Sequence, residues 1–520
     1  MSKRDETDFN FETYVAAQVE KQYSVPAYSG KRALDFTPFE VALSALDDAT
    51  RVRLHELLNE ASVGAIQAHF TDGALTAEQV VLYYLNRIRT FDPDRLNSVI
   101  ELNPHALEEA RTRDAERTAG RPRGPLHGVP VLLKDNVAAL GMHNSAGAKA
   151  LEAAVPDRDS FVVAKLRAAG AVLLGKANLS EWANFMTSTS NNGFSVLGGQ
   201  TRNPYGRFDA GGSSSGSAVA VAADLAPLSI GSETSGSISY PASQNSIVGI
   251  KPSIGLVSRD HVIPITDAMD TLGPMARNVT DAALLLTVIA GADPADPLTG
   301  EAASLVPSSL VIASGGDHLK GLRIGMCRPE QDTRKGDGTI FDRIATILRG
   351  AGAELVAIPF PEGVPYLDVL HYGMKFGVAD YLAATRAPLS SLADVIAFNA
   401  ADLPNRAPYG QDLLEKSQEM SITREAFASM VTTNRTRARE MLNLLHIEHN
   451  VSLLVSLSNQ LAALYAPAGC PAVIVPAGYR DDGEPIGVTF VGPYLSETLL
   501  INAAYGFEQA AQARRKPDGF

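Results

Sequence analysis

Two serine-rich blocks and one upstream lysine carry the side chains with the clearest chemical potential in this chain. The blocks are residues 211–217 (GGSSSGS) and 231–237 (GSETSGS). Lys134 follows the apolar run 131–133, which is typical of a buried strand. Burial lowers the pKa of an ammonium group, so Lys134 could act as a neutral base. Because a proton can pass from one hydroxyl through a second to an amine, two serines and this lysine suffice for acyl transfer.

Gly- and Ser-rich stretches usually form flexible turns, so each block needs an anchor before it can serve as a site. The first block continues into residues 217–223 (SAVAVAA), which are apolar all round and predict a buried helix. The second block follows the apolar run 228–230, which predicts a strand. Backbone N–H groups that converge at the end of that strand could hold an oxyanion.

The spacing of these motifs resembles the pattern of the amidase signature enzymes. Asp135 and Asn136 follow the lysine, the first block reads Gly-Gly-Ser-Ser-x-Gly-Ser, and Ser237 lies 24 residues after Ser213. The resemblance runs from about residue 70 nearly to the C-terminus through residues 124–130, 175–181, 201–205, 248–252, 270–277 and 471–478. Within the family, residues 233–237, 255–259, 394–399 and 409–411 look like the subgroup that contains peptide C-terminal amidases.

The resemblance implies a role for each motif residue. It makes Ser237 the nucleophile, Ser213 a bridging serine that often carries a cis peptide in the family, and Lys134 the terminal base. The oxyanion hole would consist of the backbone N–H groups of Thr234, Ser235, Gly236 and Ser237. Weaker expectations place substrate contacts at Gly212, Ser214, Ser239 and Tyr240. The implied reaction is hydrolysis of a linear carboxamide through an acyl-enzyme, with release of ammonia or an amine and with no cofactor or metal.

Two positions depart from the common family pattern. Many members have arginine where this chain has Ser239, and glycine or aspartate where it has Ser235. Both changes leave the expected catalytic atoms in place. They leave the substrate open, because these side chains lie beside the expected acyl site.

Several other functions remain open at the level of sequence. The same residues could form an esterase, a carbamate hydrolase or the glutaminase subunit of a tRNA amidotransferase. Residues 212–216 also match a Gly-x-Ser-x-Gly elbow with Ser214 as nucleophile and His261, His371 or His446 as base, although residues 204–210 do not predict the strand that an elbow requires. A phosphate- or nucleotide-binding module could use the Gly/Ser loops, but the Gly-Lys-Ser/Thr ending of a P-loop is missing.

The composition favours a cytoplasmic enzyme, and the resemblance implies a small-molecule or short-peptide amide as the substrate of a monomer or homodimer. A formal charge of −13 argues against nucleic-acid binding. No apolar run resembles a signal peptide or reaches the ~20 residues of a membrane span. The ten histidines show no metal-ligand spacing. Cys327 and Cys470 are expected to be reduced thiols.

The elements that must position the site alternate between strands and helices, which predicts an α/β fold. We expect an N-terminal helical extension over residues 1–65. The resemblance implies that residues 66–520 form one α/β/α domain with a mixed twisted sheet covered on both faces and a mostly helical, substrate-shaping segment at about 361–450. Predicted strands are 129–133, 171–174, 228–230, 247–250, 322–326, 354–358, 451–457, 473–475 and 487–491. Predicted helices include 340–348, 423–445 and one that starts at a Thr76/Gln79 capping box and ends at Asp92-Pro93.

Overall fold

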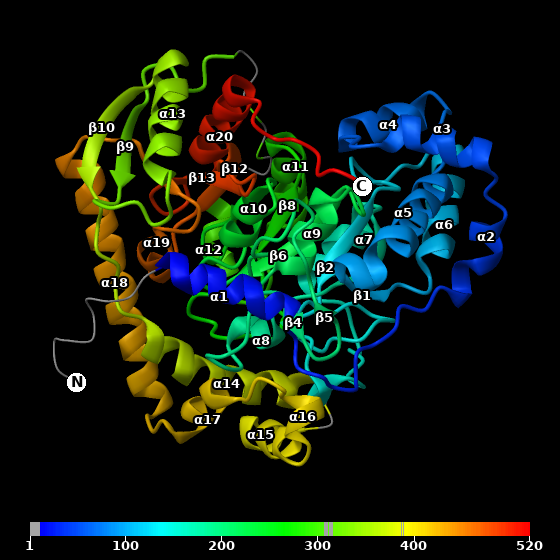
Figure 1. Cartoon of the computed structure of the whole chain (residues 1–520), viewed down its shortest axis with the longest axis horizontal. Coiled ribbons are helices and arrows are strands. Elements are labelled where there is room, and N and C mark those ends of the chain that lie inside the picture. The colour runs from blue at the N-terminus through cyan, green and yellow to red at the C-terminus, as the bar shows by residue number, and fades with distance from the viewer. Residues whose placement is uncertain (1–10, 306–309, 311, 313–315, 386, 388) are drawn as a thin grey trace.

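A mixed sheet of eleven strands forms the centre of the computed structural model, which describes residues 11–305, 310, 312, 316–385, 387 and 389–520. Helices cover both faces of the sheet (Figure 1), as the sequence predicted. In spatial order the strands are β1 (Val99–Leu102), β3 (Val172–Ala177), β2 (Pro130–Lys134), β6 (Leu228–Glu233), β8 (Thr271–Ala276), β7 (Val248–Lys251), β12 (Ala472–Tyr479), β13 (Pro485–Val491), β11 (Leu453–Leu457), β9 (Arg323–Arg328) and β10 (Glu354–Pro359). A separate pair consists of β4 (Phe194–Ser195) and β5 (Gly199–Gln200).

The strands that carry the serine and lysine motifs lie next to each other in this sheet. β2 pairs in parallel with both β3 and β6, and β6 pairs antiparallel with β8. Every residue of β2, β3 and β6 is buried. Parallel strands that are covered on both faces read as continuous apolar runs, which explains why the sequence located them correctly.

The helices connect the strands and form the outer layers. The α-helices are α1 (Phe11–Tyr23), α2 (Glu40–Ser44), α3 (Asp48–Leu58), α4 (Val63–Thr71), α5 (Ala77–Phe91), α6 (Ala106–Thr118), α7 (Phe161–Ala168), α8 (Glu181–Asn184), α9 (Ser215–Ala222), α10 (Ser239–Gln244), α11 (Val279–Ile289), α12 (Thr299–Leu305), α13 (Asp337–Gly350), α14 (Leu367–Thr385), α15 (Leu392–Ala400), α16 (Leu403–Arg406), α17 (Asp412–Glu419), α18 (Arg424–Glu448), α19 (Ala462–Ala468) and α20 (Glu497–Ala511). Short helices of other types are η1 (Thr37–Phe39), η2 (Asp92–Leu96) and η3 (Lys149–Leu151).

The described part of the N-terminal region contains α1, η1, α2 and α3, with residues 24–36 in neither a helix nor a strand. Residues 1–10 of the predicted extension lie outside the described residues. Leu54 and Leu58 on α3 are buried, and Leu57 packs against the same core. Residue 65 falls inside α4, so a domain boundary at this point stays a prediction.

The segment from 361 to 450 consists mostly of helices. α14, α15, α16 and α17 lie together at the bottom of Figure 1, and α18 runs along its left side. Val369, Val395, Leu414 and Leu442 are buried in one apolar cluster. The residues predicted to share a face of the long helix pack partly buried against that cluster, namely Phe427, Val431, Met441 and Leu445.

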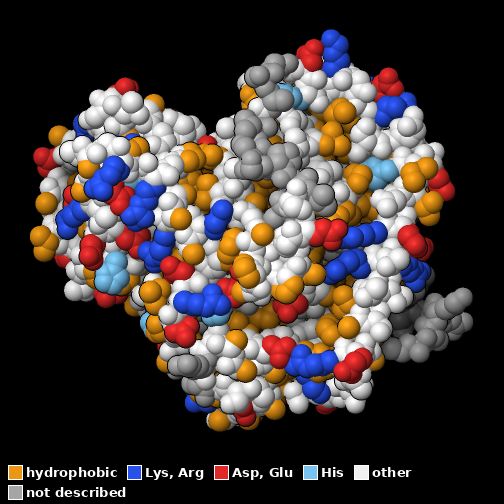
Figure 2. Space-filling model, turned by 180° about the vertical axis from the view of Figure 1, so that it is seen from behind, with side chains coloured by type: hydrophobic (Ala, Val, Ile, Leu, Met, Phe, Trp, Pro, Cys, Tyr) orange, Lys and Arg blue, Asp and Glu red, His pale blue; other side chains and the backbone are white. Residues whose placement is uncertain are grey.

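The surface and the cysteines agree with the composition. On the face in Figure 2, Lys and Arg side chains lie among Asp and Glu side chains and form no continuous positive patch. Within the described part of the chain, no helix is both long enough and apolar enough to cross a membrane. Cys327 and Cys470 are free and buried. Burial raises the pKa of the Cys327 thiol to about 12 and that of Cys470 to about 11.

The predicted capping box at the start of α5 gives a test of local stability. The Gln79 N–H donates to Thr76 Oγ1 and the Thr76 N–H donates to Gln79 Oε1, both at 3.2 Å. Thr76→Ala should lower the free energy of unfolding by about 1 kcal/mol, because one N-terminal donor loses its acceptor. Urea unfolding measures the change. The control Thr346→Ala, on the exposed face of α13, should cause no loss; equal losses in both variants would contradict the capping role.

Candidate active site

Lys134 is the last residue of β2 and lies beside the end of β6. The register pairs Leu133 with Ile230, so the carboxyl ends of these two parallel strands meet at one edge. The second serine block begins within β6, which continues through Glu233. The Lys134 side chain is fully buried. The strand pairing therefore brings the lysine to the residues that precede Ser237.

Three oxygen atoms surround the amino group of Lys134. Nζ donates to Ser213 Oγ at 2.8 Å, to Ser232 Oγ at 2.9 Å and to the Ser232 carbonyl oxygen at 3.2 Å. Burial lowers the pKa of Lys134 to about 7, against a partial opposing effect of the carboxylates of Asp270 and Glu233. A large fraction of the amine is therefore neutral near pH 7, whereas an exposed lysine is neutral only about once in a few thousand.

Ser213 occupies a tightly packed turn before α9. The Gly212–Ser213 peptide bond is cis, as the family resemblance implied. The Ser180 N–H donates to the Ser213 carbonyl at 3.0 Å. A Cβ atom on Gly212 would lie 2.6 Å from both Asn192 Oδ1 and Ser180 Oγ. Gly212 therefore serves close backbone packing here, and its expected substrate contact stays a prediction.

The loop that carries Ser237 is organised around the carboxylate of Glu233. Oε1 accepts the Gly236 N–H at 2.8 Å, while Oε2 accepts the Ile238 and Ser239 N–H groups at 2.7 and 2.9 Å. The Tyr465 hydroxyl donates to Oε1 at 2.9 Å. Sequence reasoning assigned Glu233 no role, although an acidic residue inside a Gly/Ser block was the available signal.

The expected oxyanion donors differ in how far they are engaged. Of the loop residues, all of which the structure describes, Thr234, Ser235 and Ser237 make no hydrogen bond through their backbone N–H groups. The Gly236 N–H differs, because it already donates to Glu233. Gly236 has a φ of +85°, which suits the turn. Three of the four expected donors are thus open beside Ser237, whose exposed fraction is 8%.

The hydroxyls expected to contact substrate have partners within the protein. Ser214 Oγ donates to the Ser232 carbonyl at 3.0 Å and accepts the Ser232 N–H at 3.1 Å. Ser239 Oγ lies 3.1 Å from Glu233 Oε2 and 2.7 Å from the Tyr465 hydroxyl. The Tyr240 hydroxyl donates to Asp209 at 2.9 Å. In this structure these groups support the loops, and substrate contact by any of them stays a prediction.

The histidines proposed for the Ser214 elbow have other partners. His261 contacts Asp260, His371 contacts Ser417 Oγ, and His446 contacts the Val451 carbonyl. None of the three contacts Ser214 in the part of the chain that is described. In the same part, no group of three or more His, Cys, Asp or Glu side chains is placed to hold a metal ion.

Two further residues join the site without having been assigned a role from the sequence. Asp270 accepts the Thr234 hydroxyl at 2.5 Å and the Ile265 and Thr266 N–H groups at 2.8 and 3.0 Å. Burial raises its pKa to about 7. The Tyr366 hydroxyl lies 2.9 Å from Ser235 Oγ and links the loop to the segment that follows residue 361. The family motif at 270–277 could have indicated a role for Asp270, whereas no sequence pattern indicated one for Tyr366.

Comparisons with known proteins agree on one family. A family model described as "Amidase" matches residues 79–442. A probable amidase of Arabidopsis thaliana is 37% identical over 92% of this chain and 96% of that protein. The structure of an amidase family protein from Bacillus anthracis has a TM-score of 0.89 and 40% identity over 93% of this chain and 97% of that one. The native peptide amidase of Stenotrophomonas maltophilia has a TM-score of 0.83 and 43% identity over 88% and 98%.

The buried amine predicts a specific dependence of stability on pH. Lys134→Met keeps an unbranched side chain but removes the ionisable group. Since burial lowers the pKa of Lys134 from 10.5 to about 7, the unfolded chain carries one more proton than the fold between these pH values. The stability of the wild type relative to Lys134→Met should therefore rise by about 1.4 kcal/mol per pH unit across this window. Urea unfolding at pH 7.5, 8.5 and 9.5 measures it, and parallel curves would contradict the lowered pKa.

Proposed function

This chain belongs to the amidase family of hydrolases, which cleave amide C–N bonds, and we propose that it hydrolyses a linear carboxamide through an acyl-enzyme on Ser237. The observation that carries this proposal is the 2.8 Å hydrogen bond from the buried amino group of Lys134 to Ser213 Oγ. This bond lies beside a loop that holds Ser237 next to open backbone N–H groups. It supports a proton path that needs no histidine.

In the proposed mechanism the Ser237 oxygen attacks the amide carbonyl carbon. Its proton passes to Ser213 Oγ, while the Ser213 proton passes to the neutral amine of Lys134. The oxyanion that forms accepts hydrogen bonds from the N–H groups of Thr234, Ser235 and Ser237. Gly236 was expected to contribute as well, but the bond of its N–H to Glu233 favours a structural role.

The second half of the mechanism returns the proton and releases both products. Ser213 donates a proton to the departing nitrogen as the C–N bond breaks, and Lys134 restores the Ser213 proton. Ammonia or an amine leaves, and the acyl group remains as an ester on Ser237. Water then attacks this ester, gives its proton back through the same groups and releases the carboxylic acid.

Similarity to a peptide amidase at 43% identity supports a peptide amide as the substrate. The Tyr366–Ser235 contact supports the proposal that the helical segment at about 361–450 shapes the acyl site. A cytoplasmic location, a monomeric or homodimeric state and the division at residue 65 belong to the same proposal and rest on the sequence.

A panel of peptide amides, aryl amides, esters, carbamates and glutamine would separate the hydrolase alternatives. Glutamine turnover that requires co-purified partner subunits would favour the tRNA amidotransferase alternative, and a nucleotide-induced thermal shift would favour the phosphate-binding one.

Replacement of the proposed nucleophile should abolish turnover. Ser237→Ala should lower kcat for a peptide amide by about 10⁴-fold or more, because no acyl-enzyme can form. Ser214→Ala should keep most of kcat and instead lower the unfolding midpoint, because it loses two buried hydrogen bonds. An acyl-directed serine reagent with peptide mapping checks the site of labelling. If Ser214→Ala were inactive and Ser237→Ala active, the nucleophile assignment would be wrong.

Removal of the proposed base should change both the rate and its pH dependence. For the wild type, kcat/KM should rise with pH through an apparent pKa of about 7 and then level off, because neutral Lys134 is the active form. Lys134→Ala should lose about 10²- to 10⁴-fold. The loss should be larger for amides than for activated esters, whose leaving groups need no returned proton. The control Lys320→Ala, at an exposed position, should match the wild type; a Lys134→Ala profile equal to that of the wild type would exclude Lys134 as the base.

A further inference from the structure

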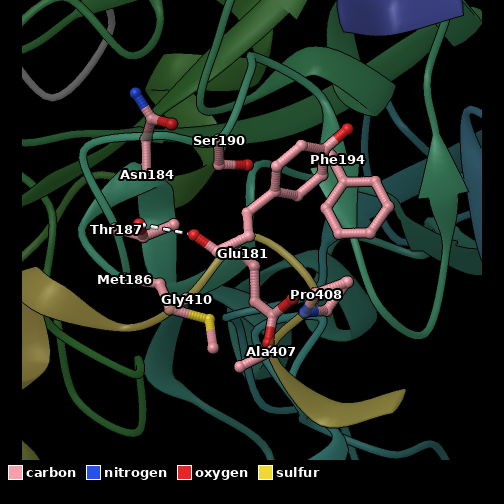
Figure 3. Close-up of a pocket in the computed structure, with 10 residues that line it drawn as sticks. Glu181, Asn184, Met186, Thr187, Ser190, Phe194, Ala407, Pro408 and Gly410 are labelled. Atoms are coloured by element: carbon pink, nitrogen blue, oxygen red, sulfur yellow. Dashed lines mark hydrogen bonds between the residues drawn. The ribbon is translucent and has the colours of Figure 1, made fainter. Parts of the chain in front are cut away.

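A narrow cavity lies between two segments of the chain. One is α8 and the loop after it, and the other is residues 407–410, just before α17. Its space for a water-sized group is about 10 Å³, and it opens partly to solvent. Figure 3 shows the side chains around it. The polar lining residues are Glu181, Asn184, Thr187, Ser190 and Tyr409. No role has been assigned to this cavity so far, although Ser180, next to Glu181, is bonded to Ser213.

The cavity contains two buried polar atoms that have no partner. Glu181 is 6% exposed, and its Oε2 accepts the Val196 N–H at 2.9 Å while its Oε1 has no hydrogen-bond partner. The Tyr409 hydroxyl is buried without a partner as well. Buried polar groups are satisfied in most proteins, so two unsatisfied oxygens in one cavity indicate a missing hydrogen-bond partner.

The lining selects the charge of that partner. Among the ten lining residues, all of them described, there is no lysine, arginine or histidine, and the polar groups are a carboxyl, three hydroxyls and one amide. The Phe194 and Tyr409 rings meet edge to face with centroids 4.9 Å apart. Aromatic walls and a carboxyl group that can ionise favour a cation and disfavour an anion. The Thr187 hydroxyl donates to the Tyr409 carbonyl at 3.0 Å and holds the two walls together.

We propose that this cavity binds a primary ammonium group, with Glu181 Oε1 and the Tyr409 hydroxyl as two of its acceptors. A primary ammonium supplies up to three N–H donors and a charge that pairs with the carboxylate. The group could be free ammonium or the end of an alkyl chain that enters through the open side. Both share the same chemistry at the carboxylate.

Binding should release a proton. Burial raises the pKa of Glu181 to about 8, so most of this carboxyl group is protonated at pH 7. The titratable groups that face it are Tyr28 and Tyr409, and burial raises the pKa of each to about 12. Neither tyrosine titrates near pH 7. An ammonium cation that enters the cavity pairs with the carboxylate and displaces the Glu181 proton into solution.

The experiment measures proton release and thermal stability with the whole chain at pH 7. Methylammonium chloride should release close to one proton per chain in weakly buffered solution and raise the unfolding midpoint saturably. Potassium chloride and tetramethylammonium chloride at equal ionic strength should do neither. Parallel titrations with ammonium and n-butylammonium identify the source: a response to ammonium alone assigns free ammonium, and a response to both assigns an amine on a chain.

Variants complete the test. Glu181→Gln should bind methylammonium at least about tenfold more weakly and release no proton, and Tyr409→Phe should weaken binding without removing proton release. The matched control is Glu497→Gln, because Glu497 is also buried with one unpartnered oxygen but lies outside the cavity; it should behave as the wild type. An unchanged response in Glu181→Gln, an equal response to potassium, or no proton release from the wild type would overturn the proposal. These readouts use no hydrolysis, so their failure is separate from failure of the proposed reaction.

Discussion

The site depends on the burial of one amino group at the end of a central strand. Removing an ammonium from water is costly unless it loses its charge or gains partners. Lys134 does both, since burial lowers its pKa to about 7 and three oxygens of Ser213 and Ser232 accept from it. These acceptors exist only where the cis turn at Ser213 meets the end of β6. Because β2 lies between β3 and β6, and all three strands are buried, the amino group of Lys134 is shielded from solvent.

Two buried carboxylates balance this burial and shape the neighbouring loop. Glu233 accepts N–H groups of the loop that follows it, and Asp270 accepts the N–H groups of residues 265 and 266, so each organises a turn that would otherwise leave donors unpaired. Both also favour the charged form of Lys134. Their effect opposes desolvation, and the pKa of the lysine reflects this balance. The same groups therefore fix the geometry of the loop and the protonation of the amine.

Sequence patterns predicted the strands that are buried along their whole length and the helix start that is marked by neighbouring residues. Buried strands such as β2 and β6 were found because each contains an apolar run, 131–133 in β2 and 228–230 in β6, and the Thr76 capping box was found because its signal is local. β1 and β8 were not predicted as strands. β1 carries the partly exposed Glu101, and β8 includes Gly273 and Pro274, which are unusual inside a central strand.

The site itself was predictable only in part. The Lys134–Ser213 contact was expected from the resemblance to the amidase signature enzymes. The inward hydrogen bonds of Ser239 and Tyr240 did not, since their partners Tyr465 and Asp209 are set by tertiary packing. The Glu233–Tyr465 bond joins residues 232 positions apart. A nascent chain that ends shortly after the two serine blocks therefore contains Lys134, Ser213 and Ser237. It still lacks Tyr465, so the loop around Glu233 has not gained this hydrogen bond. Such long-range closure is slow compared with local folding, so competence to react should appear only after Tyr465 has left the exit tunnel.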